Sequence, residues 1–278
     1  MPGYPFPYPK LTVFNGSGGM EYPMMVNDGT TTARARTIEL TSHEITHTYF
    51  PFFMGTNEKK YAWMDEGWAV MLITDFQDHT SNSINQIQRE MTRYSLIAGK
   101  DMDLPMMVSS LYMRSRTYRN AAYSRPSIAY HLLREIMGDE KFKNALHLYI
   151  DRWNGKHPIP YDFFYTFNEV NGENLNWFWI PWFFDYGYAD LAIKDVTTHD
   201  KQTEVVIEKI GLLPVPIKTK IVYADESEEC INYPATVWKD NSSEYRFVFS
   251  HDVNILRIEI GGEYIPDING ENNIYKHD

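Results

Sequence analysis

Apolar residues recur at helical spacing over most of the first 190 residues of the chain. The pattern predicts one helix over residues 32–50 and a second over 60–78. Residues 10–27 indicate two short strands around a glycine-rich turn, and residues 101–116 look irregular. Further helices are expected over 81–99, over 124–153 with a break at Gly138, over 161–171, and over the aromatic-rich residues 174–190.

After about residue 190 the pattern changes from a helical period to alternation. Segments such as 203–210, 217–224 and 254–262 are rich in β-branched residues and are separated by turns, which is typical of strands. We therefore expect an α+β fold in two domains. A mainly helical domain would cover residues 1–189, and a small all-β sandwich would cover residues 190–278.

Composition supports a folded chain and limits its partners. With 278 residues, of which 43% are hydrophobic and 15% aromatic, the chain can bury a sizeable core. A net charge of -11 argues against nucleic acid or an anionic membrane as partner. The single cysteine, Cys230, excludes an intrachain disulfide. We expect no membrane segment and no signal peptide, and the compartment stays open between cytoplasmic and secreted or periplasmic.

Residues 43–47 read HEITH, within the first expected helix. Residues four apart lie on one face of a helix, so His43 and His47 can direct imidazole nitrogens at one point, as zinc requires. Glu44 is displaced around the helix and can reach a water molecule bound there. This motif is typical of metalloproteases, but it arises by chance in roughly one chain in a hundred of this length. It therefore needs support from its context.

Glu66 supplies that support. It lies in WMDEGW on the second expected helix, with 18 residues between it and His47. Two histidines and one glutamate leave the fourth zinc position open, which marks a catalytic rather than a structural site. The alternative is a pair of structural histidines with a surface glutamate. The neighbouring Asp65 either orients a ligand or is a solvated helix residue, and we favour the second interpretation.

HEITH, the 18-residue gap and DEGWA together resemble the M1 family of zinc aminopeptidases, which are gluzincins. GGMEY at 18–22 resembles the family's G-x-M-E-N motif, and residues 123–142 resemble its Y-x-K-G segment with the helices that follow. The resemblance covers residues 8–190 well and the β tail more loosely. It implies a thermolysin-like zincin helical catalytic domain ahead of the β-sandwich.

The resemblance also implies a role for each motif residue, in an enzyme that removes N-terminal residues from peptides with a free N-terminus by means of zinc-activated water. One zinc ion would be bound by His43, His47 and Glu66. Glu44 would be the general base, and Tyr123 would donate a hydrogen bond to the oxyanion. Glu21 would pair with the substrate α-amino group, while the Gly18, Gly19 and Met20 backbone lies along the peptide.

Some features depart from the family pattern. Tyr22 stands where the family has Asn, and Arg125–Pro126 stands where it has Lys-Gly. By this resemblance we expect the chain to lack the β-rich domain and the first strands of the catalytic domain that the family has ahead of the G-x-M-E-N motif. We therefore expect an apolar face that this missing N-terminal region of the chain would cover, as a partner. A competing hypothesis follows, in which the chain is a folded, metal-retaining but catalytically inactive fragment or binding module.

Overall fold

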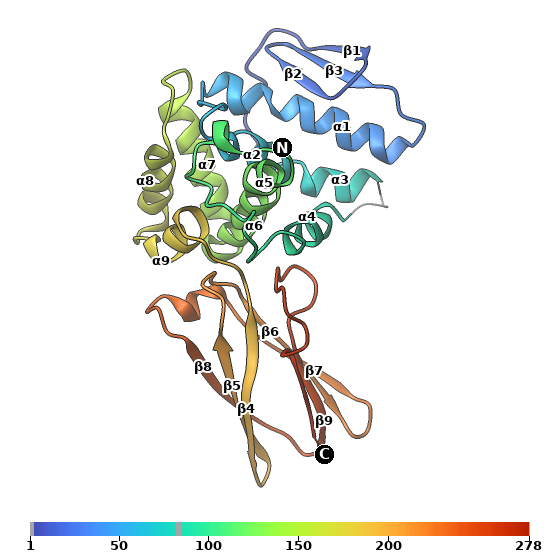
Figure 1. Ribbon diagram of the computed structural model, residues 1–278, viewed down its shortest axis with the longest axis vertical. Helices are drawn as coiled ribbons and strands as arrows, with labels where there is room; N and C mark the ends of the chain where they lie inside the picture. The colour runs from blue at the N-terminus through green and yellow to red at the C-terminus, as the bar shows by residue number, and fades with distance from the viewer. Residues whose placement is uncertain (1–2, 82–84, 278) are drawn as a thin grey trace. The chain divides into compact units, whose positions relative to one another are not determined.

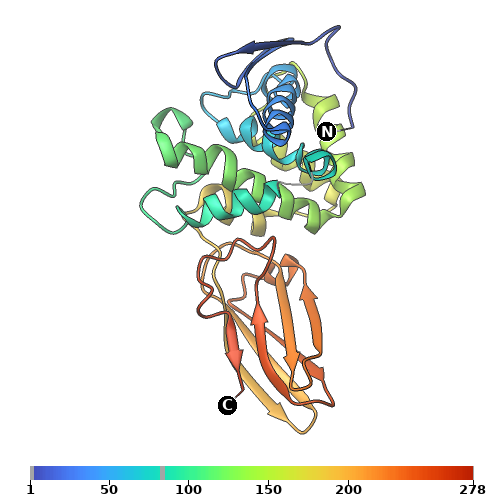
Figure 2. The same ribbon diagram turned by 90° about the vertical axis from the view of Figure 1, so that its right-hand side faces the viewer.

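The computed structural model describes residues 3–81 and 85–277. They divide into two compact units, Met1–Ile97 with Asp101–Leu175 and Ala98–Lys100 with Asn176–Asp278. Figures 1 and 2 show the first unit as mainly helical and the second as mainly strands. Across the described ranges, no helix is both long enough and apolar enough to cross a membrane. Mixed helices and sheets agree with the expected α+β class.

The first unit begins with a small three-stranded sheet in the order β1-β3-β2. Its strands are β1 (Thr12–Gly16), β2 (Met20–Tyr22) and β3 (Met25–Gly29), with β1 parallel and β2 antiparallel to β3. The sequence predicted only two strands here. The third arises because Met24, at a φ of 61°, turns the chain back directly after β2. Exposed apolar side chains lie on these strands, namely Val13, Phe14, Met20, Tyr22 and Met25.

Helices make up the rest of the first unit, and helix α1 lies against the small sheet in Figure 1. They are α1 (Arg34–Thr46), α2 (Glu66–Met71), α3 (Thr74–Ser81), α4 (Gln86–Ser95), α5 (Ser115–Arg119), α6 (Arg125–Met137), α7 (Asp139–Trp153) and α8 (Pro160–Asn171). Two π-helical turns, Thr48–Phe53 and Asn120–Ser124, and two short 3₁₀ turns, Ala62–Met64 and Ser110–Tyr112, connect them.

The expected helix over 32–50 ends early, at Thr46. Phe50 has an extended backbone, with φ at −126° and ψ at 109°, because the residue before a proline avoids the helical region. The π-helical turn around Pro51 therefore leads the chain away from the helix axis. The next helix, α2, starts at Glu66 and returns the chain to the side of α1.

Close packing fixes α2 against α6. The indole of Trp68 stacks on the ring of Tyr130 at 3.9 Å, and both side chains are fully buried. One residue earlier, a Cβ at Gly67 would lie 2.7 Å from Pro126. Glycine is therefore required where the two helices meet. This contact holds the first residue of α2, Glu66, in place.

The second unit contains the short helix α9 (Asn176–Trp179), the π-helical turn Ile180–Phe184, the 3₁₀ turn Ala235–Trp238 and two sheets. One sheet has the order β4-β5-β8, from Leu191–His199, Gln202–Lys209 and Glu244–Ser250. The other has the order β10-β9-β6-β7, from Ile274–Lys276, Ile255–Ile260, Ile217–Tyr223 and Glu228–Tyr233. Tyr233 of β7 contacts Phe247 of β8 at 5.1 Å between ring centres, so side chains of the two sheets meet.

Candidate metal centre

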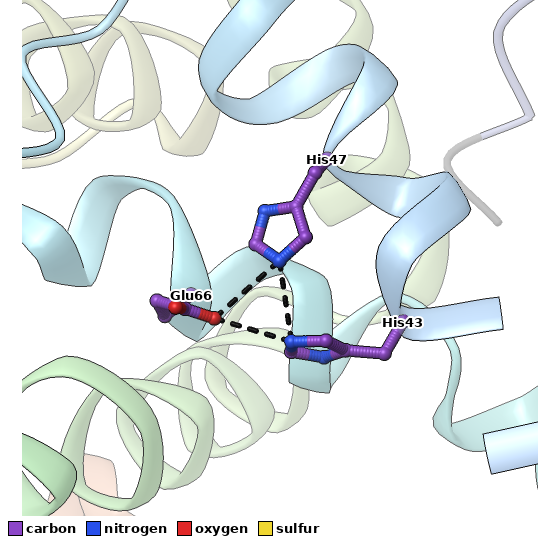
Figure 3. A group of neighbouring side chains, drawn as sticks. All are labelled: His43, His47 and Glu66. Carbon is purple, nitrogen blue, oxygen red and sulfur yellow. Dashed lines mark hydrogen bonds and ion pairs between the residues drawn. The ribbon is translucent and has the colours of Figure 1, made fainter. Parts of the chain in front are cut away.

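Helices α1 and α2 bring three potential metal ligands together (Figure 3). His43 lies on α1 and His47 follows one turn later as its C-cap residue, and their Nε2 atoms are 3.2 Å apart. Glu66 projects from the start of α2, with Oε2 3.2 Å from His43 Nε2 and 3.4 Å from His47 Nε2. The three donor atoms therefore form a nearly equilateral triangle.

The triangle has the size that a zinc ion requires. Tetrahedral zinc, with bonds of about 2.0–2.1 Å to nitrogen and oxygen, separates neighbouring ligand atoms by about 3.3–3.4 Å. The edges of 3.2–3.4 Å match this spacing. Two imidazoles and one carboxylate are also a typical ligand set of catalytic zinc. The residues present thus fit one zinc ion, with room for a fourth ligand.

The ligand groups are buried, and burial shapes their protonation. Desolvation lowers the pKa of His43 and favours the neutral imidazole, the form that binds metal. Burial alone would raise the pKa of Glu66, but hydrogen bonds from His43 and His47 outweigh it and lower that pKa. Glu66 is therefore ionised at neutral pH. Burial opposes protonation of His47, but the carboxylates of Asp65 and Glu66 outweigh it and raise the pKa of His47, so a cation that binds there must displace a proton.

Asp65 does not behave as the solvated residue that we expected. Its side chain is only 3% exposed, and Oδ1 lies 2.6 Å from His47 Nδ1. The other neighbour of Nδ1 is the carbonyl oxygen of Phe50 at 3.0 Å. Both neighbours accept hydrogen bonds, so Nδ1 carries a proton and Nε2 faces the donor triangle. The expectation of a solvated helix residue was wrong, and Asp65 orients His47.

Glu44 lies beside the triangle. It is 5% exposed, and its Oε2 has no hydrogen-bond partner among the described residues. Desolvation raises the pKa of Glu44 to about 7. A Cβ at Gly19 would lie 2.6 Å from Glu44 Oε1, whereas the neighbouring Gly18 has open space around it. Gly19 thus leaves the room that the Glu44 carboxylate occupies.

Tyr123 and Glu21 reach the same region from other elements. Tyr123 belongs to the π-helical turn before α6, and its hydroxyl donates a hydrogen bond to Glu66 Oε1. Desolvation, then the negative charge of Glu66, raises the pKa of Tyr123, so the hydroxyl keeps its proton. Glu21, on β2, has a carboxylate oxygen within 4.8 Å of ligand atoms of Glu44 and His47. Met20 is 44% exposed beside it.

Two cavities adjoin the triangle. One, of about 510 Å³, is lined by Glu21, Glu58, Asp65 and Glu66 among others. The second, of about 320 Å³, is lined by His43, Glu44 and Tyr123, with Arg36, Arg93 and Arg119. No sequence motif indicated Glu58 or the three arginines. No spacing rule joins them, because they come from separate elements and meet only in the fold.

Comparison with known proteins defines the family. Residues 19–182, more than half of the chain, match the model of the Peptidase family M1 domain. The chain therefore belongs to peptidase family M1, which confirms the resemblance of its motifs and places it among the metalloprotease hydrolases.

The relatives found are aminopeptidases that are longer than this chain. It is 25% identical to aminopeptidase N of Plutella xylostella over 171 residues, 56% of this chain and 18% of that protein. It is 22% identical to aminopeptidase N of Haemophilus influenzae over 216 residues, 70% of this chain and 25% of that protein. The chain thus spans a quarter or less of the length of these relatives.

One solved structure shares the fold over most of the chain. The crystal structure of Legionella pneumophila aminopeptidase A in complex with aspartic acid matches with a TM-score of 0.66 at 16% identity. The match covers 90% of this chain and 30% of that chain. At this identity the likeness concerns the fold alone.

Proposed function

We propose that the protein hydrolyses the N-terminal residue from peptides, with one zinc ion held by His43, His47 and Glu66. The observation that carries this proposal is the donor triangle with Glu44 beside it, a buried glutamate whose Oε2 has no hydrogen-bond partner among the described residues. We also propose that its helical part is a thermolysin-like catalytic domain and its β part a small sandwich, with a boundary near residue 189. The aminopeptidase relatives support the reaction class.

Zinc at this point would lower the pKa of a water molecule and polarise the carbonyl group of the peptide. Glu44 would take a proton from the attacking water and deliver it to the leaving nitrogen. A pKa of about 7 suits both steps, because the carboxylate can then gain and lose a proton near neutral pH. Its unpartnered Oε2 leaves an acceptor free for this purpose.

Tyr123 would stabilise the oxygen that becomes negatively charged. Its hydroxyl already lies beside the ligand set through its hydrogen bond to Glu66. Because the pKa of Tyr123 is raised, the hydroxyl remains a donor throughout the neutral range. One such donor is typically worth about 3–4 kcal/mol in the transition state.

Glu21 would restrict the reaction to the end of a peptide. Its carboxylate lies close to Glu44 and His47, where an α-amino group could form a charged hydrogen bond. An internal peptide bond offers no positive charge at that position. Glu21 is therefore the residue that separates removal of terminal residues from cleavage within a chain.

The test uses the zinc-loaded chain and two chromogenic alanine anilides, one with a free amine and one acetylated. We expect turnover of the free amine only, abolished by a chelator. Glu21→Ala should lower kcat/KM for the free amine by about 10²-fold and remove the preference. Equal rates on both substrates, unchanged by Glu21→Ala, would contradict terminal specificity. No turnover by a folded, zinc-loaded sample would favour the inactive module instead.

A further inference from the structure

The cavity beside Glu44 has a positively charged wall. Its lining includes three arginines, namely Arg36 of α1, Arg93 of α4 and Arg119 of α5. His43 and Glu44 line the same cavity. Its volume of about 320 Å³ is enough for one or two amino-acid side chains. Three guanidinium groups from three different helices thus converge on one space next to the donor triangle.

Positive charge exceeds negative charge in this wall. Four arginines share two glutamates, with Arg36 and Arg89 paired to Glu39, and Arg93 and Arg119 paired to Glu90. Of these residues, Arg36, Arg93, Arg119 and Glu39 line the cavity, and Glu44 is the other acidic residue there. The lining therefore holds three guanidinium groups and two carboxyl groups. The excess of positive charge is local, since the whole chain carries a net charge of -11. The balance of charged side chains in the cavity lining is thus opposite in sign to the net charge of the chain.

The arginines that line the cavity keep donors free for a ligand. Each guanidinium has five N–H groups, and a single ion pair uses only one or two of them. The side chains of Arg36, Arg93 and Arg119 are 54%, 36% and 45% exposed. Gln86, buried at 3% exposure, also lines the cavity, and its Oε1 has no hydrogen-bond partner among the described residues. Its amide can turn to present a donor instead.

The place of this cavity follows from the proposed reaction. Glu44 delivers its proton to the leaving nitrogen, which belongs to the second residue of the peptide. The cavity lined by Glu44 is therefore where that second residue lies. The α-amino group of the first residue belongs near Glu21, which lines the other cavity with Glu58 and Asp65. That other lining holds four acidic residues against Lys59 and Arg114, so acidic residues prevail in it and arginines prevail in the cavity beside Glu44.

We propose that the cavity lined by Arg36, Arg93 and Arg119 binds a carboxylate on the second residue of the substrate, either the terminal carboxylate of a dipeptide or an acidic side chain. This inference rests on the proposed function and adds a substrate class to it. The guanidinium groups would bind the carboxylate by charge-assisted hydrogen bonds. The preferred substrates are then dipeptides and peptides with Asp or Glu in second place.

The test measures binding rather than turnover. Glu44→Gln would remove the general base, so that peptides stay intact during calorimetry on the zinc-loaded protein. The ligands are Ala-Ala, Ala-Ala-amide and Ala-Glu-amide. We expect at least one of the two peptides with a carboxylate to bind about tenfold more tightly than Ala-Ala-amide. Tight binding of Ala-Ala points to a terminal carboxylate, and tight binding of Ala-Glu-amide points to an acidic side chain.

Substitution of the arginines tests whether this cavity is the source of the preference for a carboxylate. Arg36→Met, at an exposed position, should reduce the preference to about twofold or less, and Arg93→Met should act in the same direction. Arg152→Met is the matched control, because Arg152 pairs with Glu169 and lines neither cavity. It should leave the preference intact.

Two results would overturn the inference alone, and a third would also contradict the proposed function. Equal binding of all three peptides would exclude a carboxylate site. A preference that survives both Arg36→Met and Arg93→Met in folded protein would place the site elsewhere. Failure of every peptide to bind would contradict the proposed function itself, and the inference would fall with it.

Discussion

At the scale of single residues, Gly19 determines where the Glu44 carboxylate can lie. A Cβ at this position would lie 2.6 Å from Glu44 Oε1 and 2.7 Å from Leu40 Cδ1. Both distances are shorter than van der Waals contact. Glu44 is largely buried and borders the cavity of about 320 Å³, so an added Cβ would displace its carboxylate from its present position toward that cavity. The glycine therefore serves the site through its missing side chain, in addition to any contact of its backbone with a peptide.

Gly19→Ala should accordingly lower kcat/KM by about 10²-fold, because the base moves by roughly an ångström. The fold should persist, since the position is exposed at the edge of the small sheet. Steady-state kinetics with circular dichroism would check both points. Gly18→Ala is the control, because its added Cβ meets nothing within 4 Å. If Gly18→Ala lowered kcat/KM as much as Gly19→Ala, the activity would depend on the backbone freedom of the glycines and not on the space that Gly19 leaves for Glu44.

The motif spacing predicted which residues form the donor triangle, but the sequence did not predict the role of Asp65, which precedes Glu66. His43 and His47 are four apart on a real helix, so helical geometry applied to them. The same reasoning failed for Asp65, which precedes α2 with φ at −120° and ψ at −79°. Outside a helix, its side chain is free to turn toward His47. A carboxylate next to a metal ligand in sequence was the signal that could have identified it.

At the scale of elements, the site depends on how closely α2 approaches α6. Glu66 is the first residue of α2, and Gly67 meets Pro126 and Tyr130 of α6 without space for a side chain. Any group added at Gly67 must push the two helices apart. Such a shift would move Glu66 away from the histidines of α1, which are held by other contacts.

Gly67→Ala is therefore expected to lower the free energy of unfolding by about 1–3 kcal/mol, the usual cost of overpacking. It should also weaken zinc binding, because Glu66 moves with the helix. Urea unfolding and competition with a chelator would measure the two effects. Gly270→Ala, with open space around its added Cβ, should change neither. If Gly67→Ala destabilised the fold but left zinc affinity unchanged, the packing of α2 against α6 would not be what positions Glu66.

Element type was more predictable than element boundaries. The predicted helix over 60–78 became a 3₁₀ turn and two helices, with breaks at Asp65 and between Met71 and Thr74. Apolar spacing alone cannot reveal such breaks, because the buried residues keep a helical period across them. Pro51 did provide a signal, and it ends the first helix before residue 50 through its effect on Phe50.

At the scale of the whole molecule, every residue proposed for the reaction lies in the first compact unit. Zinc stabilises the structures that bind it by mass action, and the stabilisation rises with the logarithm of the zinc concentration over Kd. Added zinc should therefore slow amide hydrogen exchange in α1 and α2. Strands of the second unit such as β6 should change little. Hydrogen exchange with mass spectrometry would map the effect.

His47→Ala provides the control, because it removes one donor from the triangle. Zinc should then give no protection in α1. Protection that persists in this variant, or protection centred on the β strands, would place the metal elsewhere in the molecule.

The sequence alone did not predict which residues far apart in the chain lie close together in the fold. Arg36, Arg93 and Arg119 are separated by dozens of residues and belong to three helices. Each of them, considered alone, resembles a solvated charge on a helix surface. Only the packing of α1, α4 and α5 brings them to one cavity.

The hydrogen bond between Tyr123 and Glu66 has one more consequence. A peptide must compete with a carboxylate for the phenolic proton. A neutral carbonyl oxygen is a weaker acceptor than a carboxylate and competes poorly, whereas an oxygen that gains negative charge competes well. The resting contact would thus withhold the proton from a substrate that is merely bound and release it as the reaction proceeds. Discrimination between ground state and transition state would then reside in a contact that exists before any peptide arrives.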